Sequence, residues 1–103
     1  MYKQQVMKIN IQFNHARPHD GLRDLITQKV AKLSHFNEHI LACDVHFLLD
    51  NATEAEDKIC EIKLIVPGND FFAKQKAVSF EEAATRAVTA LERQMEKRKA
   101  THS

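Results

Sequence analysis

Residues 79–99 read SFEEAATRAVTALERQMEKRK and carry the clearest helix pattern in the chain. Apolar side chains recur in this stretch at spacings of three and four, which places them along one side of an α-helix. They are Phe80, Ala83, Ala84, Ala87, Val88, Leu91 and Met95. Ser79 can accept a hydrogen bond from the backbone N–H of Glu82 while Glu82 reaches back, a capping box that marks a helix start. We therefore predict a helix that packs one apolar stripe against a flat surface.

The end of this predicted helix is rich in cations. Arg93, Lys97, Arg98 and Lys99 lie within seven residues, relieved only by Glu96. One interpretation is a solvated last turn whose positive charges complement the helix dipole. The other is an arm that holds phosphate groups, because the dipole alone needs fewer cations. The stretch by itself leaves both interpretations open.

Length, composition and charge favour one soluble globular domain. The chain has 103 residues, of which 44% are hydrophobic and 28% charged. No apolar run approaches the roughly 18 residues of a membrane span, so we expect a cytoplasmic protein without a membrane segment. The net charge of +1 conceals an uneven distribution: residues 37–70 hold eight acidic and two basic residues, and residues 71–103 hold four acidic and seven basic ones. This asymmetry predicts an acidic end and a basic face that attracts polyanions.

Four segments have the period of two that is typical of half-buried β-strands. They span residues 7–13, 41–49, 60–66 and 71–77. The acidic residues 51–57 predict a hairpin loop, and Pro67-Gly68-Asn69-Asp70 predicts a tight turn. In the fourth strand, Phe72, Lys74 and Lys76 lie on one face, and Phe71, Ala73 and Gln75 lie on the other. The pattern does not decide which of these two faces is buried.

A second amphipathic helix is predicted from Leu22 to about His35, with further apolar residues at Leu25, Ile26, Val30 and Leu33. At 100° per residue, Lys29 falls within the apolar sector. Either its stem lies along the core and its amine reaches water, or it emerges in a seam between two helices. The element order predicts an α+β class: a two-layer β-α-β-β-β-α domain whose four-stranded sheet has two roughly parallel helices packed on one face.

The residues provide little for catalysis. Gly21 and Gly68 are the only glycines, and neither stands in a phosphate-binding loop. Cys43 and His46 are three apart on a strand, so their side chains point to opposite faces and cannot share one metal ion. We read Cys43 and Cys60 as reduced core residues. We expect a protein that is not an enzyme and has no metal, no cofactor and no small-molecule substrate.

The order of elements, the run LRDLITQKVAKL at residues 22–33 and the segment ALERQMEKRK at residues 90–99 resemble the ribosome hibernation promoting factors. These proteins are also called ribosome-associated inhibitors or sigma-54 modulation proteins. The resemblance spans nearly the whole chain, and its most characteristic part is Leu91-Glu92-Arg93-Gln94 with the cations that follow. It implies a cytosolic protein with the same element order, which binds the small ribosomal subunit where messenger and transfer RNA would lie.

Matched by position, the resemblance implies RNA-binding cations on both helices, and a recurrent cation at position 29 favours the seam for Lys29. Ala90 and Glu96 depart from the family, whose members often have basic residues there, which implies a weaker or shifted grip. The predicted RNA-binding residues are Arg23, Lys29, Lys32, Lys74, Lys76, Arg86, Arg93, Lys97, Arg98 and Lys99.

The resemblance implies a hibernation factor that occupies the decoding region of the small subunit and blocks transfer and messenger RNA. The expected partner is ribosomal RNA (rRNA), and we expect a monomer when the protein is free. We expect one ribosome-binding domain over residues 1–103, without the C-terminal domain by which long family members pair ribosomes. The acidic loop, with Asp50, Glu54, Glu56 and Asp57, should stay off the RNA because carboxylates repel phosphates. The alternative is a protein-interaction module or a modulator of a transcription factor that acts through acidic and basic surfaces.

Overall fold

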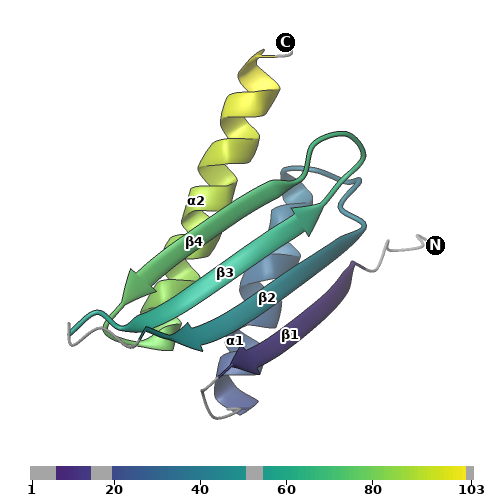
Figure 1. Ribbon diagram of the computed structural model, residues 1–103. Coiled ribbons are helices and arrows are strands. Elements are labelled where there is room, and N and C mark those ends of the chain that lie inside the picture. The colour runs from purple at the N-terminus through teal and green to yellow at the C-terminus, as the bar shows by residue number, and fades with distance from the viewer. Residues whose placement is uncertain (1–6, 15–19, 51–54, 102–103) are drawn as a thin grey trace.

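The computed structural model of the chain describes residues 7–14, 20–50 and 55–101 (Figure 1). Its elements confirm the predicted β-α-β-β-β-α order and the α+β class. In chain order they are β1 (Lys8–Asn14), α1 (Asp20–Ala31), the short 3-10 helix η1 (Lys32–His35), β2 (Ala42–Leu49), β3 (Lys58–Ile65), β4 (Phe71–Ala77) and α2 (Phe80–Thr101).

The sheet order makes the two helices parallel. The strands lie in the order β1-β2-β3-β4, with β1 and β2 parallel and the other two pairs antiparallel. β4 therefore runs in the same direction as β1, and each helix follows one of these two strands. Both helices lie behind the sheet in Figure 1 and run toward the same end of the molecule, as predicted. Their C-terminal ends, and the cations there, consequently share one end of the fold.

The register between strands separates a buried face of the sheet from an open one. Cys43, Val45 and Phe47 pair with Leu64, Ile62 and Cys60, and all six side chains are buried. On β4 the buried side chains are Phe71, Ala73 and Ala77, whereas Phe72, Lys74 and Lys76 are exposed on the open face. The structure thus shows which face of β4 is buried, because pairing with β3 fixes which of its residues align with the core.

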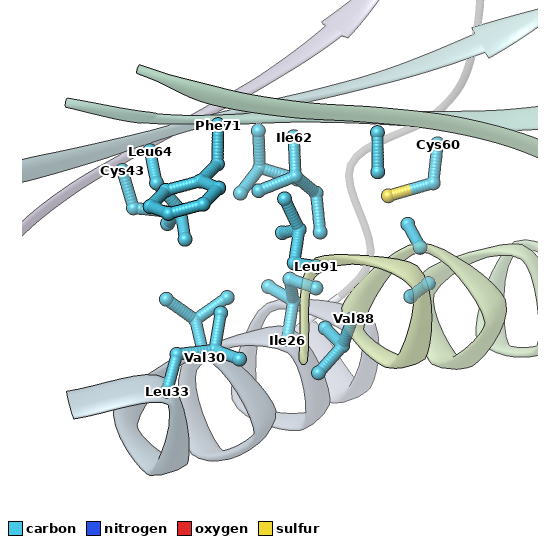
Figure 2. Packing of buried hydrophobic residues seen from close by; sticks show 14 of the residues in the cluster. Ile26, Val30, Leu33, Cys43, Cys60, Ile62, Leu64, Phe71, Val88 and Leu91 are labelled. Atoms are coloured by element: carbon cyan, nitrogen blue, oxygen red, sulfur yellow. The ribbon is translucent and has the colours of Figure 1, made fainter. Parts of the chain in front are cut away.

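The core fills the space between the sheet and both helices. Figure 2 shows Ile26 and Val30 from α1 and Leu91 from α2 directed toward the buried face of the sheet, with Leu33 and Val88 packed in the same cluster. Three alanines at the start of α2 are also fully buried: Ala83, Ala84 and Ala87. Small side chains let the helix approach the strands closely. Although α2 has 22 residues, no helix in the described part of the chain is long and apolar enough to cross a membrane.

The predicted start of α2 is confirmed, but the capping box is only half formed. The backbone N–H of Glu82 donates to Ser79 Oγ at 3.1 Å, as predicted. The Glu82 carboxylate does not return to the Ser79 N–H among the described residues. It accepts instead from the guanidinium of Arg86, one turn further along the helix. An opposite charge at i+4 thus takes the place of the second cap.

The turn between β3 and β4 forms where the sequence places it. Gly68 has a φ of +95°, a conformation that residues with a side chain rarely adopt. The backbone N–H of Val66 donates to Asp70 Oδ1 at 3.2 Å and closes the turn. These two features bring β4 back alongside β3.

Both cysteines are reduced and buried, as predicted. Burial is the main cause that raises the pKa of each thiol, from 9.0 to about 12. Asp44 adds a smaller contribution at Cys43, and Cys43 and Glu61 add smaller ones at Cys60. The folded protein therefore keeps both thiols neutral at a pH at which an unfolded chain ionises them.

We predict that alkali destabilises the protein through these thiols. Above pH 9 the unfolded state releases protons that the folded state keeps, so the free energy of unfolding falls by at most about 1.4 kcal/mol per pH unit for each thiol. Urea unfolding between pH 8 and pH 11 measures this slope. The Cys43→Ala/Cys60→Ala variant should lose this part of the slope, and an unchanged slope in the variant would contradict the assignment.

Candidate nucleic-acid interface

Parallel helices bring most of the predicted cations of both helices toward one end of the helical layer. Lys29 lies in the last turn of α1 and Lys32 begins η1, while Arg93, Lys97 and Lys99 lie in the C-terminal half of α2. All of these side chains except half-buried Lys29 are exposed. This end of the layer is consequently the most basic part of the two helices.

The structure gives support to both interpretations of Lys29. Its side chain is half-buried beside the buried Val30, as expected for a stem that lies along the core. It forms no hydrogen bond or ion pair with any described residue, so the amine remains available. Arg23, on the other flank of α1, lies over the ring of Phe13 on β1 at 5.2 Å. Lys29 is therefore on the flank that faces α2.

Arg93 and Lys97 do not line the seam between the helices together with Lys29. Arg93 borders a recess with Gln75 of β4, and Lys97 borders another with Phe71. Both cations lie on the side of α2 that faces β4, because the helical period turns them away from α1. The cations of α2 that approach the segment after the first helix are Arg98 and Lys99, which line an open cleft of about 530 Å³ with residues 35–39.

Several polar side chains of α2 serve the fold rather than a partner, because they cover the free edge of β4. Arg86 donates to the carbonyl oxygen of Lys76 at 2.7 Å, and Gln94 donates to that of Phe72 at 2.8 Å. Arg98 reaches the turn before the strand. Four residues of helix rise about 6 Å, and two residues of strand rise about 6.8 Å, so the two elements stay in step. The spacing of four along α2 thus matches the outward carbonyls of β4.

Arg98 is one of the predicted RNA-binding cations that contacts within the protein hold in place. Its guanidinium donates to the carbonyl oxygens of Asn69 and Asp70, and its central carbon lies 3.5 Å from the ring centroid of Phe71. These contacts join the last turns of α2 to the turn between β3 and β4. These bonds use two of the five N–H donors of the guanidinium, and the ring contact fixes its position beside β4.

Three further predicted cations have acidic partners within the protein. Lys74 and Lys76 lie on the open face of the sheet, where their amines are 3.7 Å from Glu61 and 2.7 Å from Asp50, respectively. Arg86 pairs with Glu82 and, at 3.4 Å, with Glu56 of the acidic loop. Of that loop's predicted carboxylates, Glu54 lies outside the described residues. The acidic loop is therefore partly neutralised by cations that sequence reasoning assigned to RNA.

In the segment Leu91-Glu92-Arg93-Gln94, some side chains stabilise the fold and others are exposed on the surface. Leu91 is fully buried, and Gln94 covers the edge of β4. Arg93 is exposed and forms no ion pair with a described residue. Sequence reasoning missed the role of Gln94, and no local pattern reveals it, because its partner Phe72 is 22 residues away.

The structure also tests the metal site that the sequence disfavoured. Cys43 is buried against the helices, and His46 is half-buried on the open face of the sheet, 4.0 Å from Glu61. The two side chains point to opposite faces, as predicted. Within the described residues, no group of three or more His, Cys, Asp or Glu side chains is placed to hold a metal ion.

Comparison with known proteins gives a family and a fold. A family model described as sigma 54 modulation protein / S30EA ribosomal protein matches residues 9–103. A ribosomal subunit interface protein from Coxiella burnetii has a similar structure, with a TM-score of 0.81 and 20% identity over 91% of this chain and 99% of that one. The N-terminal domain of Thermus thermophilus Protein Y has a TM-score of 0.76 and 24% identity over 88% and 98%. None of the curated proteins matches the chain in sequence.

The division between held and available cations predicts unequal effects on stability. Arg98→Gln removes the contact with Phe71 and the bonds to two carbonyl oxygens, and should lower the free energy of unfolding by about 1 to 2 kcal/mol. Arg93→Gln on the same helix should change it by less than about 0.5 kcal/mol, because the side chain is exposed and unpaired among the described residues. Urea unfolding of both variants measures the difference, and equal losses would contradict the division.

Proposed function

We propose that this chain, which belongs to the sigma 54 modulation protein / S30EA ribosomal protein family, binds rRNA of the small ribosomal subunit through its helical layer. Membership in a ribosome-associated family supplies the partner. The distribution of cations indicates which face of the protein binds the RNA, because phosphates require positive charge that no internal carboxylate has already neutralised.

The observation that carries this proposal is the contrast between two sets of cations. Lys29, Lys32, Arg93 and Lys99 form no ion pair with any described residue. Lys29, Lys32 and Lys99 lie where the parallel helices end, and Arg93 lies about two turns before the end of α2. Lys58, Lys63, Lys74 and Lys76 of the sheet each have an acidic partner within 4.0 Å. Charge that remains available is thus concentrated on the helical side.

The proposed mechanism is occlusion by a rigid body. Lysine and arginine contacts to phosphates provide affinity and position, while the shape of the folded rRNA provides specificity. In the decoding region, the bound domain excludes messenger and transfer RNA by volume and needs no catalytic step. The ribosome is silenced as long as the domain stays bound, and the protein acts as a cytoplasmic monomer.

The acidic loop supports one orientation on the ribosome. Asp50, Glu56 and Asp57 lie at the end of the sheet where α2 begins, as the pair between Arg86 and Glu56 shows. Lys99 lies at the opposite end of α2, and Lys29 and Lys32 lie at the same end of the fold. Carboxylates repel phosphates, so the end with the loop points away from the rRNA or toward a basic protein.

Neutralising the available cations should weaken binding without unfolding the domain. The Lys32→Gln/Arg93→Gln/Lys99→Gln variant touches no buried side chain. If each cation contacts one phosphate, the slope of log affinity against log salt should flatten by roughly 2 units. Sedimentation with purified small subunits at several salt concentrations measures the affinity.

The matched control removes the same charge from the sheet. Lys8→Gln/Lys58→Gln/Lys63→Gln should leave the salt slope within about half a unit of the wild type. Equal losses in both triple variants would mean diffuse attraction rather than a helical interface. Absence of the wild-type protein from every ribosomal fraction would exclude the function and favour a protein-interaction module.

A further inference from the structure

A recess opens between the free edge of β4 and the outer flank of α2. Its volume is about 280 Å³, and its wall includes Gln75 from the strand and Arg86, Ala90 and Arg93 from the helix. It lies on the same side of α2 as Arg93, one of the available cations of the helical layer. The residues around it differ in whether their hydrogen-bonding groups and charges have partners within the protein.

Gln75 presents an unused carboxamide to this recess. The residue stands between Ala73 and Ala77, which are both buried on the face toward the helices, yet its own side chain is half-buried. The carboxamide forms no hydrogen bond with any described residue. An amide has two donors and one acceptor oxygen, and leaving such groups unmatched costs free energy once water is displaced. The side chain is therefore suited to a ligand that both donates and accepts.

Ala90 creates the space because it interrupts the row of side chains that covers β4. Arg86, Ala90, Gln94 and Arg98 follow one another at spacings of four. Arg86 reaches the carbonyl oxygen of Lys76, and Gln94 reaches that of Phe72. The alanine methyl group is too short to reach the strand between them. One position on the edge of β4 therefore stays uncovered, and the positions on both sides of it are covered by Arg86 and Gln94.

The gap is too short for a peptide strand but suits a small polar unit. Strand addition needs several consecutive free backbone groups along an edge, and Arg86 and Gln94 occupy the positions on either side. Arg93 stands at the rim without an ionic partner among the described residues. Arg86, at the other side, is held by Glu82 and by the carbonyl oxygen of Lys76. The recess thus combines one available cation with one neutral amide.

We infer that this recess binds one ribose–phosphate unit of RNA, an inference that rests on the proposed function. Arg93 would contact the phosphate, and the Gln75 carboxamide would contact the ribose 2′-hydroxyl. That hydroxyl donates and accepts, as the amide requires, and it is the group by which a protein distinguishes RNA from DNA. The recess therefore contributes preference for RNA in addition to affinity.

The test removes the amide without changing any charge. In Gln75→Met, affinity for purified small subunits should fall about fivefold, the effect of one neutral hydrogen bond. The salt slope should stay the same, because the phosphate contacts remain. A single-stranded RNA of mixed sequence and the DNA of the same sequence serve as probes, and the variant should lose the preference of the wild type for the RNA.

Two further variants make the result specific. Ala90→Gln fills the recess and should reproduce the loss, whereas Gln12→Met removes an exposed amide from the open face of the sheet and should bind like the wild type. Wild-type affinity in both Gln75→Met and Ala90→Gln, or an equal loss in Gln12→Met, would overturn the inference and leave the ribosomal function standing. Failure of the wild-type protein to bind subunits would instead overturn the function, and the inference with it.

Discussion

Everything in this domain follows from packing two apolar stripes on one face of a four-stranded sheet. Removing apolar surface from water is the main favourable contribution to folding, and here α1 and α2 cover adjacent halves of the same face. The alanines at the start of α2 bring it close to the strands, and Leu91 fills the space further along. Because β4 runs parallel to β1, the helices have to run parallel too, which places their basic ends together.

The same packing decides which cations remain available. α2 lies beside the free edge of β4, so side chains at a spacing of four reach its carbonyl oxygens. Arg86 and Gln94 are used in this way, whereas Arg93 turns toward solvent. An edge strand with open carbonyls invites association with other strands, and covering it protects the domain. One row of residues therefore covers the edge, while Arg93 on the same helix is exposed and forms no ion pair with a described residue.

Periodicity predicted the architecture well because strands and helices differ in their period, and each stripe here is nearly uninterrupted. Phe71 and Phe72 show where prediction from periodicity fails. Both faces of β4 look alike in sequence, and only pairing with β3 shows that Phe71 is buried and Phe72 exposed. Lys97 and Arg98 show the same limit for the site. They are neighbours of equal charge, but Arg98 meets the carbonyl of Asn69, 29 residues away, which no local pattern predicts.

Directed hydroxyl-radical cleavage would show most directly which face meets the RNA. The native thiols are buried, so an iron chelate attaches selectively to one introduced cysteine, at exposed Thr27 on the helical layer or at exposed Gln12 on the open face of the sheet. Each labelled protein is bound to small subunits, and the cleaved rRNA positions are mapped. The account predicts strong cleavage in the decoding region from Thr27→Cys and little from Gln12→Cys. Strong cleavage from the sheet position alone would contradict it.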